Sequence, residues 1–201
     1  QIITMTNVEP KSTILHPLME ELNSYITVDI ETSGPAPGLY SLLSIGACTV
    51  AKPHRTFYIE IAPVNDRIVE EAMSVNQLSM EKLKEKGIQP AEALQRFETW
   101  IDRVVPAGSQ PIFLAFNASF DWMFVNDYFY RYLGHNPFGH SALDIKAYYM
   151  GRMGVPWKEA SHRYVSRRYM DDHHLTHHAL QDAIDEAEIF GKMIKEISGY
   201  R

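Results

Sequence analysis

The spacing of hydrophobic and polar positions predicts strands early in the chain and mostly helices later. Runs rich in β-branched and other apolar residues indicate strands at 25–31, 42–50 and 56–61. The turn at residues 52–54 would join the second and third of these into an antiparallel hairpin. A further run at 111–116 is wholly apolar, which is typical of a strand buried between layers of helices.

The helical pattern begins after these first strands. Residues 64–86 are expected to be mostly helical and polar, with Gly87 ending the segment, and Pro90 opens the next helix. Ser119 is a plausible N-cap for a helix that ends near Gly134. Later segments start near residues 143 and 179 and carry apolar residues at helical spacing. This order favours one α/β domain with a mixed sheet over residues 25–201, preceded by an irregular lead-in over residues 1–24.

Composition narrows the class of protein. The chain has 201 residues, of which 45% are hydrophobic, and this suits a folded domain with a sizeable core. A net charge of -6 argues against coating nucleic acid by bulk electrostatics, although a local basic strip could still hold a few nucleotides. Cys48 is the only cysteine, so neither a disulfide framework nor a thiolate zinc cluster is expected. We found neither an apolar run of membrane-spanning length nor a signal peptide, so we expect a cytoplasmic protein without membrane contact.

The first candidate site is a pair of acids at the end of the first strand. Alternate residues of a strand share a face, so Asp29 and Glu31 point the same way, with Cα atoms roughly 6.7 Å apart at about 3.3 Å of rise per residue. Such a pair can converge on one hard cation. Two solvated acids beside a turn are the alternative interpretation, so the pair gains weight only if further carboxylates come from elsewhere in the chain.

Two later segments supply those carboxylates. Asp121 falls in the first turn of the helix after the apolar strand, where an acid can also simply complement the helix dipole. His177 and Asp182 would lie roughly 140° apart if both were on one helix with about 100° per residue. They can therefore cooperate only if His177 lies on the loop entering the helix and Asp182 lies inside it. A capping histidine and a surface aspartate are the alternative.

The three segments together resemble a known family. Asp29-x-Glu31, Asn117-x-x-Phe120-Asp121 and His177-x-Ala179-x-x-Asp182 resemble, in this order, the motifs of the DEDDh family of 3′–5′ exonucleases. The resemblance spans roughly residues 25 to 197. It implies a ribonuclease H-like fold, in which a mixed β-sheet is flanked by α-helices. It also implies a hydrolase that cuts phosphodiester bonds from the 3′ end of single-stranded nucleic acid.

The resemblance also implies roles for these residues. Asp29, Glu31 and Asp182 would hold the ion that carries the attacking water, Asp29 would bridge two ions, and Asp121 would act on the second. Oxygen ligands suit Mg²⁺ or Mn²⁺, and two such ions about 3.5–4 Å apart can assist hydrolysis of a phosphodiester. His177 would be the general base. The adjacent His178 is its chemical rival, but the family spacing, five residues before the aspartate, selects His177, and we expect His178 to be structural or solvent-exposed.

Substrate contacts are expected around the motifs. By resemblance, Thr32 and Ser33 would seat the terminal nucleotide, and Glu31 could reach its 3′ hydroxyl. Phe120 is a candidate wall of the site, although we favour a place in the core. Asn117 would orient its loop or form an Asx turn.

A basic and aromatic strip precedes the third motif and suits single-stranded nucleic acid. Its cations include Arg167 and Arg168, and a charged helix face with buried rings is the alternative. The remaining members of the strip are Arg152, Trp157, Lys158, His162, Arg163, Tyr164 and Tyr169.

Several alternatives stay open at this point. Asn136-Pro137-Phe138 followed by Asp144 resembles the corresponding stretch of ribonuclease T, which favours RNA slightly, and we expect Asp144 to cap a helix. A DNA-specific exonuclease of repair or proofreading would share every motif. An alternative of another class is a non-catalytic zinc-binding protein built on His173, His174, His177 and His178. Members of the family often form dimers, so a homodimer is possible.

Overall fold

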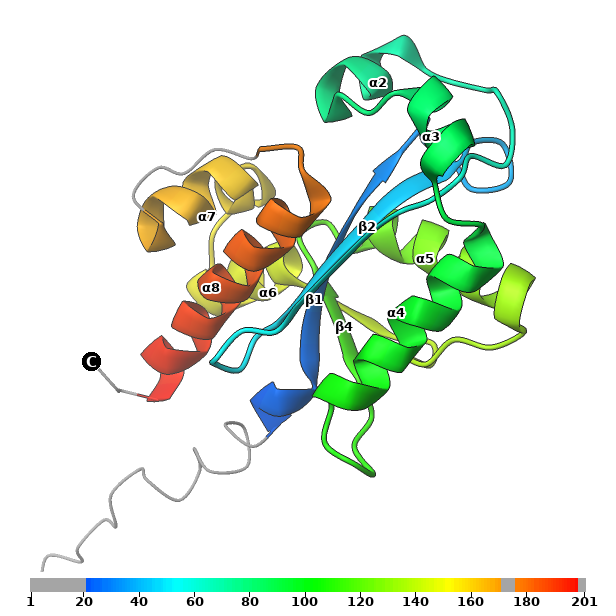
Figure 1. Ribbon diagram of the computed structural model, residues 1–201. Coiled ribbons are helices and arrows are strands. Elements are labelled where there is room, and N and C mark those ends of the chain that lie inside the picture. The colour runs from blue at the N-terminus through cyan, green and yellow to red at the C-terminus, as the bar shows by residue number, and fades with distance from the viewer. Residues whose placement is uncertain (1–20, 171–175, 199–201) are drawn as a thin grey trace, which may run out of the picture.

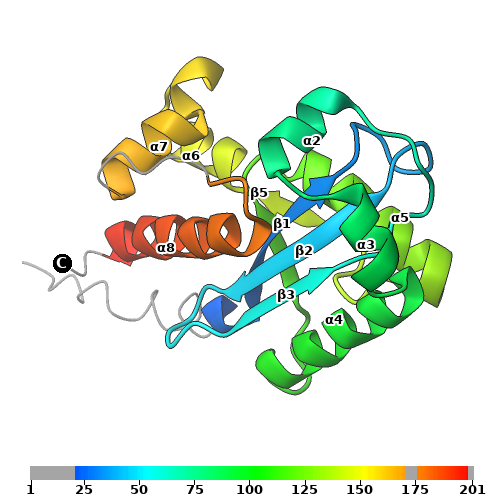
Figure 2. The ribbon, with the colours of Figure 1, turned by 45° about the horizontal axis from the view of Figure 1, so that its top comes forward.

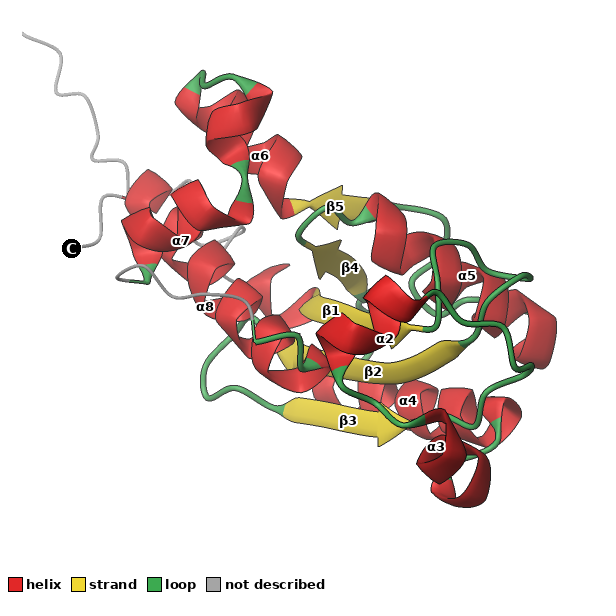
Figure 3. Cartoon of the chain, turned by 90° about the horizontal axis from the view of Figure 1, so that it is seen from above, coloured by secondary structure: helices red, strands yellow, loops and turns green. Residues whose placement is uncertain are grey.

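A five-stranded mixed sheet forms the centre of the molecule. The computed structural model describes residues 21–170 and 176–198, so most of the expected lead-in lies outside the described residues. The strand order is β3-β2-β1-β4-β5, as seen from above in Figure 3. Strand β1 pairs with β2 antiparallel and with β4 parallel. The strands are β1 (Tyr25–Thr32), β2 (Leu42–Thr49), β3 (Thr56–Glu60), β4 (Ile112–Ala115) and β5 (Ala142–Asp144).

Helices cover both faces of this sheet (Figures 1 and 2). On one face α4 (Pro90–Val104) and α5 (Ser119–Leu133) pack against Ile26, Val28 and Ile30 of β1. On the other face lie α6 (Ile145–Met153), α7 (His162–Tyr169) and α8 (Ala179–Ser198). Because side chains alternate along a strand, the odd-numbered residues of β1, Asp29 and Glu31 among them, face α8. The predicted α/β architecture is confirmed.

The segment after β3 differs from its prediction. Residues 64–69 are not helical, and the expected single helix is two short ones, α2 (Glu70–Asn76) and α3 (Met80–Lys86). Gln77, with a left-handed φ of 58°, ends α2, and Ser79 caps α3 by accepting the N–H of Lys82. A backbone bond explains the late start of α2, because Val69 N–H donates to Ser33 O just after β1. Gly87 follows α3 as predicted.

Two details of the helix ends bear on the site. Ser119 is the first residue of α5 and not its cap, because Ala118 holds the N-cap position. Asp144 caps α6 as expected, since its Oδ1 accepts the N–H of Ala147 at 2.8 Å. Two short 3₁₀ helices complete the described elements, η2 (Leu22–Ser24) and η3 (Trp157–Ala160).

Within the described residues, no helix combines the length and apolar character needed to cross a membrane.

Candidate active site

Four carboxylates from three elements meet at one edge of the sheet. Strands β1 and β4 are parallel, so β1 ends beside the turn that leads from β4 into α5. Asp29 and Glu31 come from β1, Asp121 from the first turn of α5, and Asp182 from the first turn of α8. Together with His177 they line a cavity of about 250 Å³. Its other lining residues are Ile30, Phe116, Asn117 and Phe120.

Three of the acids are close enough to share an ion. Carboxylate oxygens of Asp29, Glu31 and Asp182 lie within 4.8 Å of one another. Asp121 is 5% exposed, and its Oδ1 accepts the N–H of Ile30 at 3.2 Å, which ties α5 to β1 beside the pair. None of the ion pairs found within residues 21–170 and 176–198 involves these four acids.

Burial is the main cause of raised pKa values at Asp29, Glu31 and Asp121. Burial, and then the charges of Asp182 and Asp121, raise the pKa of Glu31 to about 8. Burial also raises the pKa of Asp121 to about 8. The pKa of Asp29 rises well above its usual range because of burial and the neighbouring Asp121. A divalent cation would favour the ionised forms, so the donor set fits a hard ion bound by oxygen.

Gly46 allows α8 to reach the sheet. It pairs with Asp29 across β1 and β2 and therefore faces the same helix. A Cβ atom built at Gly46 would lie 2.2 Å from backbone atoms of both Ala179 and Leu180. Hydrogen at this position lets the start of α8 approach closely enough to bring Asp182 to the acids of β1. This glycine was not predicted as a site residue, because its only signal in the sequence is its place inside a strand.

The loop entering α8 is held by Asp182 itself. The Asp182 carboxylate accepts the N–H and the hydroxyl of Thr176 at 2.8 and 2.9 Å, and the N–H of His177 at 2.9 Å. His177 has a left-handed φ of 53°, so it lies outside the helix, as its spacing from Asp182 requires. Its side chain is exposed and lines the cavity.

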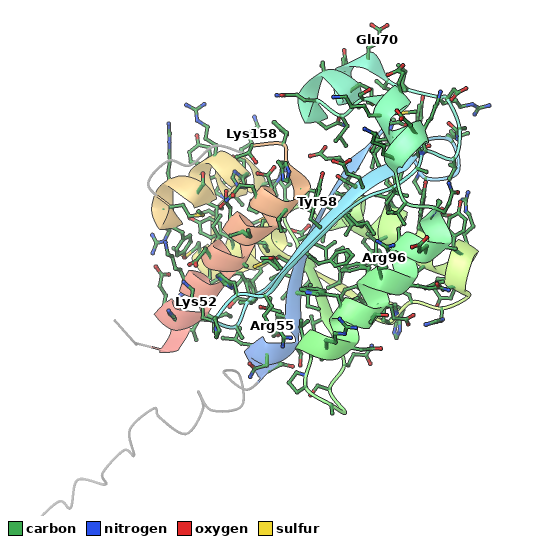
Figure 4. The ribbon with its side chains drawn as sticks, in the orientation of Figure 1. Lys52, Arg55, Tyr58, Glu70, Arg96 and Lys158 are labelled. Carbon is green, nitrogen blue, oxygen red and sulfur yellow. The ribbon has the colours of Figure 1, made fainter. Side chains whose placement is uncertain are left out.

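The neighbouring His178 packs against β3 and not against the acids. His178 stacks on Tyr58 of β3, with ring centroids 4.9 Å apart and an interplanar angle of 24°. Tyr58, labelled in Figure 4, is itself held by a hydrogen bond from its hydroxyl to Glu60 at 3.1 Å. His178 does not line the acidic cavity, whereas His177 does.

Comparison with known proteins agrees with this geometry. The family model described as "Exonuclease" matches residues 26–190, which is most of the chain. The chain belongs to the exonuclease family. It is 42% identical over 174 residues to the 3′-5′ DNA exonuclease Cap18 of Escherichia coli, which covers 87% of this chain and 92% of that protein. The predicted membership in the DEDDh family is thereby confirmed. The predicted activity class, a hydrolytic 3′–5′ exonuclease, is confirmed with it.

Solved structures show the same fold. The nuclease domain of 3′hExo, a DEDDh family member bound to rAMP, superposes with a TM-score of 0.72 at 14% identity, over 88% of this chain and 94% of that one. E. coli exonuclease I in complex with a dT13 oligonucleotide gives a TM-score of 0.61 at 17% identity. The match covers 86% of the present chain and 40% of the longer exonuclease I chain. The predicted ribonuclease H-like fold is confirmed.

The zinc-binding alternative is disfavoured by family membership. It depends partly on His173 and His174, which lie outside the described residues. Within the described part of the exonuclease, the three carboxylates of Asp29, Glu31 and Asp182 form the group of possible metal ligands.

A buried carboxylate that the sequence analysis missed lies behind the cavity. Glu186 of α8 is 2% exposed, and its Oε1 accepts the N–H of Phe116 at 3.1 Å. Burial, and then the charge of Asp121, raise the pKa of Glu186 well above its usual range. Its spacing of four residues from Asp182 was the available signal, because that spacing places both residues on one face of a helix.

The side chains expected to seat the nucleotide have different surroundings. The Thr32 hydroxyl donates to Gly34 O at 2.9 Å, and the Ser33 hydroxyl accepts the N–H of Ser41 at 2.9 Å, so both buried side chains serve their own loop. Phe120 is 37% exposed and lines the cavity, so our preference for a core position was wrong. Asn117 is exposed at the rim with a left-handed φ of 60°.

The basic strip divides into two parts. Arg168 donates to Glu196 at 3.3 Å, and Arg152 pairs with the same carboxylate at 3.2 Å. Glu196 lies fourteen residues beyond Asp182 on α8, or about 21 Å at 1.5 Å per residue. The structure therefore does not bring Arg168 to the cavity, and Arg167, also exposed, is its neighbour in the last turn of α7.

The other end of the strip is close to the cavity. The His162 ring at the start of α7 contacts the ring of Phe116, with centroids 5.3 Å apart. Arg163 follows on the surface, and Lys158, labelled in Figure 4, is exposed on η3.

Proposed function

We propose that this exonuclease removes nucleotides from the 3′ end of single-stranded DNA. The observation that carries the proposal is the convergence of four carboxylates and one exposed histidine on a single cavity. A relative that is 42% identical over most of the chain and is described as a DNA exonuclease supports the choice of DNA.

This choice revises our slight preference for RNA. That preference depended on Asn136-Pro137-Phe138 and Asp144, a short stretch that the structure explains without substrate. The Asn136 side chain accepts the N–H of Phe138 and donates to Asn126, and Asp144 caps α6. Identity over 174 residues is the stronger argument, so RNA trimming becomes the second candidate.

Two divalent ions, Mg²⁺ or Mn²⁺, are part of the proposal. Asp29, Glu31 and Asp182 would hold one ion, Asp29 would be shared, and Asp121 would serve the second. The fit is argued from the donor set, which consists of oxygen atoms only and includes acids whose pKa values are raised above all by burial. When bound, such ions supply an activated water and charge stabilisation at the scissile phosphate.

The chain's own residues carry the remaining chemistry. His177 is exposed at the cavity, where its imidazole can take the proton of the attacking water. The water oxygen forms a bond to phosphorus while the bond to the 3′ oxygen of the preceding nucleotide breaks. The released product is a nucleoside 5′-monophosphate, and the shortened chain keeps a 3′ hydroxyl.

The size and walls of the cavity support the proposed preference for single strands. A volume of about 250 Å³ suits one terminal nucleotide and no base-paired partner. Phe120 offers an exposed ring on which a base can stack. Ser33 N–H donates to Ser41 O, and Ser33 O accepts the N–H of Val69. Thr32 O accepts the side chain of Asn76, so a nucleotide contact at Thr32 or Ser33 stays a prediction. Lys158 and Arg163 would meet the phosphates upstream of the terminal nucleotide.

The test uses 5′-labelled DNA and RNA strands of one sequence, single-stranded or annealed, with Mg²⁺, Mn²⁺ or chelator. We expect a 3′-shortening ladder on single-stranded DNA that disappears in chelator and in Asp29→Asn. Faster shortening of the RNA strand would replace DNA by RNA as the substrate. Internal cuts or no cuts with either metal would refute the proposal.

The expected homodimer and the expected cytoplasmic location both stay predictions. A homodimer is expected from the family, and size-exclusion chromatography with light scattering tests it. A cytoplasmic location is tested by fractionation of cells that produce the protein.

A further inference from the structure

Glu186 is a buried carboxylate that belongs to none of the three motifs. It lies one helical turn beyond Asp182 on α8, on the same face of the helix. One of its oxygens accepts the N–H of Phe116 at 3.1 Å. Its other oxygen, Oε2, is buried and has no hydrogen-bond partner among the described residues.

Stability alone does not account for a carboxylate at this position. An oxygen that is removed from water and left without a donor lowers the stability of the folded state. The charges of Asp121 and Asp182 nearby add repulsion. An apolar side chain of similar length would pack at position 186 with less cost, because buried charged groups are often replaced by apolar ones with a gain in stability.

The partner of Glu186 indicates its use. Phe116 is the residue before Asn117, whose left-handed φ turns the chain from β4 into α5 and so places Asp121. On the other side of Asn117, Asp144 Oδ2 accepts the N–H of Ala118 at 2.7 Å. The turn at residues 116–118 is therefore held from both sides by carboxylates of other elements. Phe116 and Asn117 also line the cavity.

Because α8 carries both Asp182 and Glu186, the bond to Phe116 connects the helix of the third motif to the turn that precedes the second. We propose that Glu186 is a positioning residue, which holds the turn at 116–118 against α8 and thereby sets the separation of Asp121 and Asp182. The inference rests on the proposed function, because it concerns the same site. Glu186 acts through the backbone of Phe116 and not on the substrate.

The experiment compares wild type with Glu186→Gln, Glu186→Met and Glu188→Gln. Glutamine keeps an oxygen that can accept the Phe116 N–H, whereas methionine has a similar length and no such acceptor. Glu188 is the matched control on the same helix, because it pairs with Lys52 and His54 at the hairpin turn, away from the acids (Figure 4 labels Lys52). Mn²⁺ affinity is measured by calorimetry. The constants kcat and KM are measured on a single-stranded DNA oligonucleotide, and thermal unfolding is measured in chelator.

We expect Glu186→Met to lower Mn²⁺ affinity and kcat by about 10- to 100-fold, the usual effect of losing a group that orients metal ligands. KM should stay unchanged, and the unfolding midpoint in chelator should change little, because removal of a buried carboxylate offsets the loss of its bond to Phe116. Glu186→Gln and Glu188→Gln should behave like wild type in Mn²⁺ binding and turnover.

Three results would overturn the proposal. One is wild-type Mn²⁺ affinity and kcat in Glu186→Met. Another is an equal loss in Glu186→Gln, which would make the charge itself the functional feature. The third is a fall in unfolding midpoint with unchanged Mn²⁺ affinity of the folded protein, which would mean a purely structural role. Should the proposed substrate be wrong, wild type would leave the oligonucleotide intact, while the Mn²⁺ titrations would still distinguish the variants.

Discussion

The carboxylate of Asp182 accepts the backbone N–H of His177 at 2.9 Å, so the candidate metal ligand directly holds the loop that carries the candidate base. The same carboxylate accepts two bonds from Thr176. A single side chain thus has two tasks, to face the other acids and to keep His177 outside the helix at the cavity. Disturbance of either task is expected to affect turnover.

Thr176→Val tests the second task without removing a carboxylate. The variant loses the hydroxyl that donates to Asp182 at 2.9 Å but keeps the backbone N–H. We expect a loss of about 0.5–1.5 kcal/mol in unfolding free energy, the usual value of one hydrogen bond, and a several-fold fall in kcat at unchanged KM. Thr176→Ser keeps the hydroxyl and should turn over like wild type. Equal kinetics of all three proteins would show that this bond does not position His177.

The two adjacent histidines should differ sharply on substitution. Only His177 lines the cavity, so His177→Ala should lower kcat by about 10² to 10⁴-fold while a DNA oligonucleotide still binds. His178 instead stacks on Tyr58, so His178→Phe should keep the stack and most of the activity. Steady-state kinetics and fluorescence anisotropy measure the two properties. Full turnover in His177→Ala would exclude His177 as the base.

Gly46→Ala should disturb the approach of α8 to the sheet. The new Cβ would lie 2.2 Å from backbone atoms of Ala179 and Leu180, which cannot move as a flexible side chain can. We expect a loss of about 1–3 kcal/mol or more in unfolding free energy, with a fall in kcat because Asp182 and His177 move together.

The matched control for this substitution is Gly151→Ala in α6, where a Cβ meets nothing within 4 Å. Alanine favours helix over glycine by roughly 0.5–1 kcal/mol, so this variant should be as stable as wild type or more so. Urea unfolding compares the two. Equal stability of the two variants would contradict the close approach at Gly46.

Metal binding should stabilise the protein more at high pH than at low pH. The pKa values of Glu31 and Asp121 are about 8 in the metal-free protein, far above those of the unfolded chain. Between about pH 4 and pH 8 the folded state therefore binds more protons than the unfolded state, and the stability of the metal-free protein falls as pH rises. We expect the Mg²⁺-induced rise in Tm to be larger at about pH 8.5 than at about pH 6.

Thermal unfolding with Mg²⁺ or chelator at both pH values measures this difference. In a Glu31→Gln, Asp121→Asn double variant, the unfolding midpoint in chelator should depend less on pH over this range, with the remaining dependence contributed by Asp29 and Glu186. A Tm shift independent of pH in the wild type would mean that these two acids are ionised without metal.

Charge reversal should separate the two parts of the basic strip. Lys158→Glu with Arg163→Glu should raise KM several-fold, and more at low salt, because both cations are exposed and Arg163 follows His162, whose ring contacts Phe116 of the cavity. Arg168→Glu should leave KM unchanged and lower stability, because it places an acid against Glu196. Kinetics on the DNA oligonucleotide at two salt concentrations test this. A raised KM in Arg168→Glu would extend the substrate path along α7.

Local structure could be predicted wherever neighbouring residues decide it. Pro90 opens α4, Gly134 follows α5 and Asp144 caps α6, because each depends on backbone geometry or a short hydrogen bond. The single helix expected over residues 64–86 was wrong. Its start is displaced to Glu70 because Val69 donates to Ser33, a partner thirty-six residues away that no local pattern reveals.

The sequence by itself determined the three motifs, their order and the sharing of a strand face by Asp29 and Glu31, because these properties depend on spacing along the chain. The spacing of the third motif already favoured His177 over His178, whereas tertiary structure decided how each is placed: Asp182 accepts the N–H of His177, and His178 stacks on Tyr58. Tertiary structure also decided that α8 packs closely against Gly46, that Arg168 pairs with Glu196, and that Glu186 lies buried behind the acids. Contacts of this kind join residues distant in sequence, and they exist only once the sheet and helices have packed together.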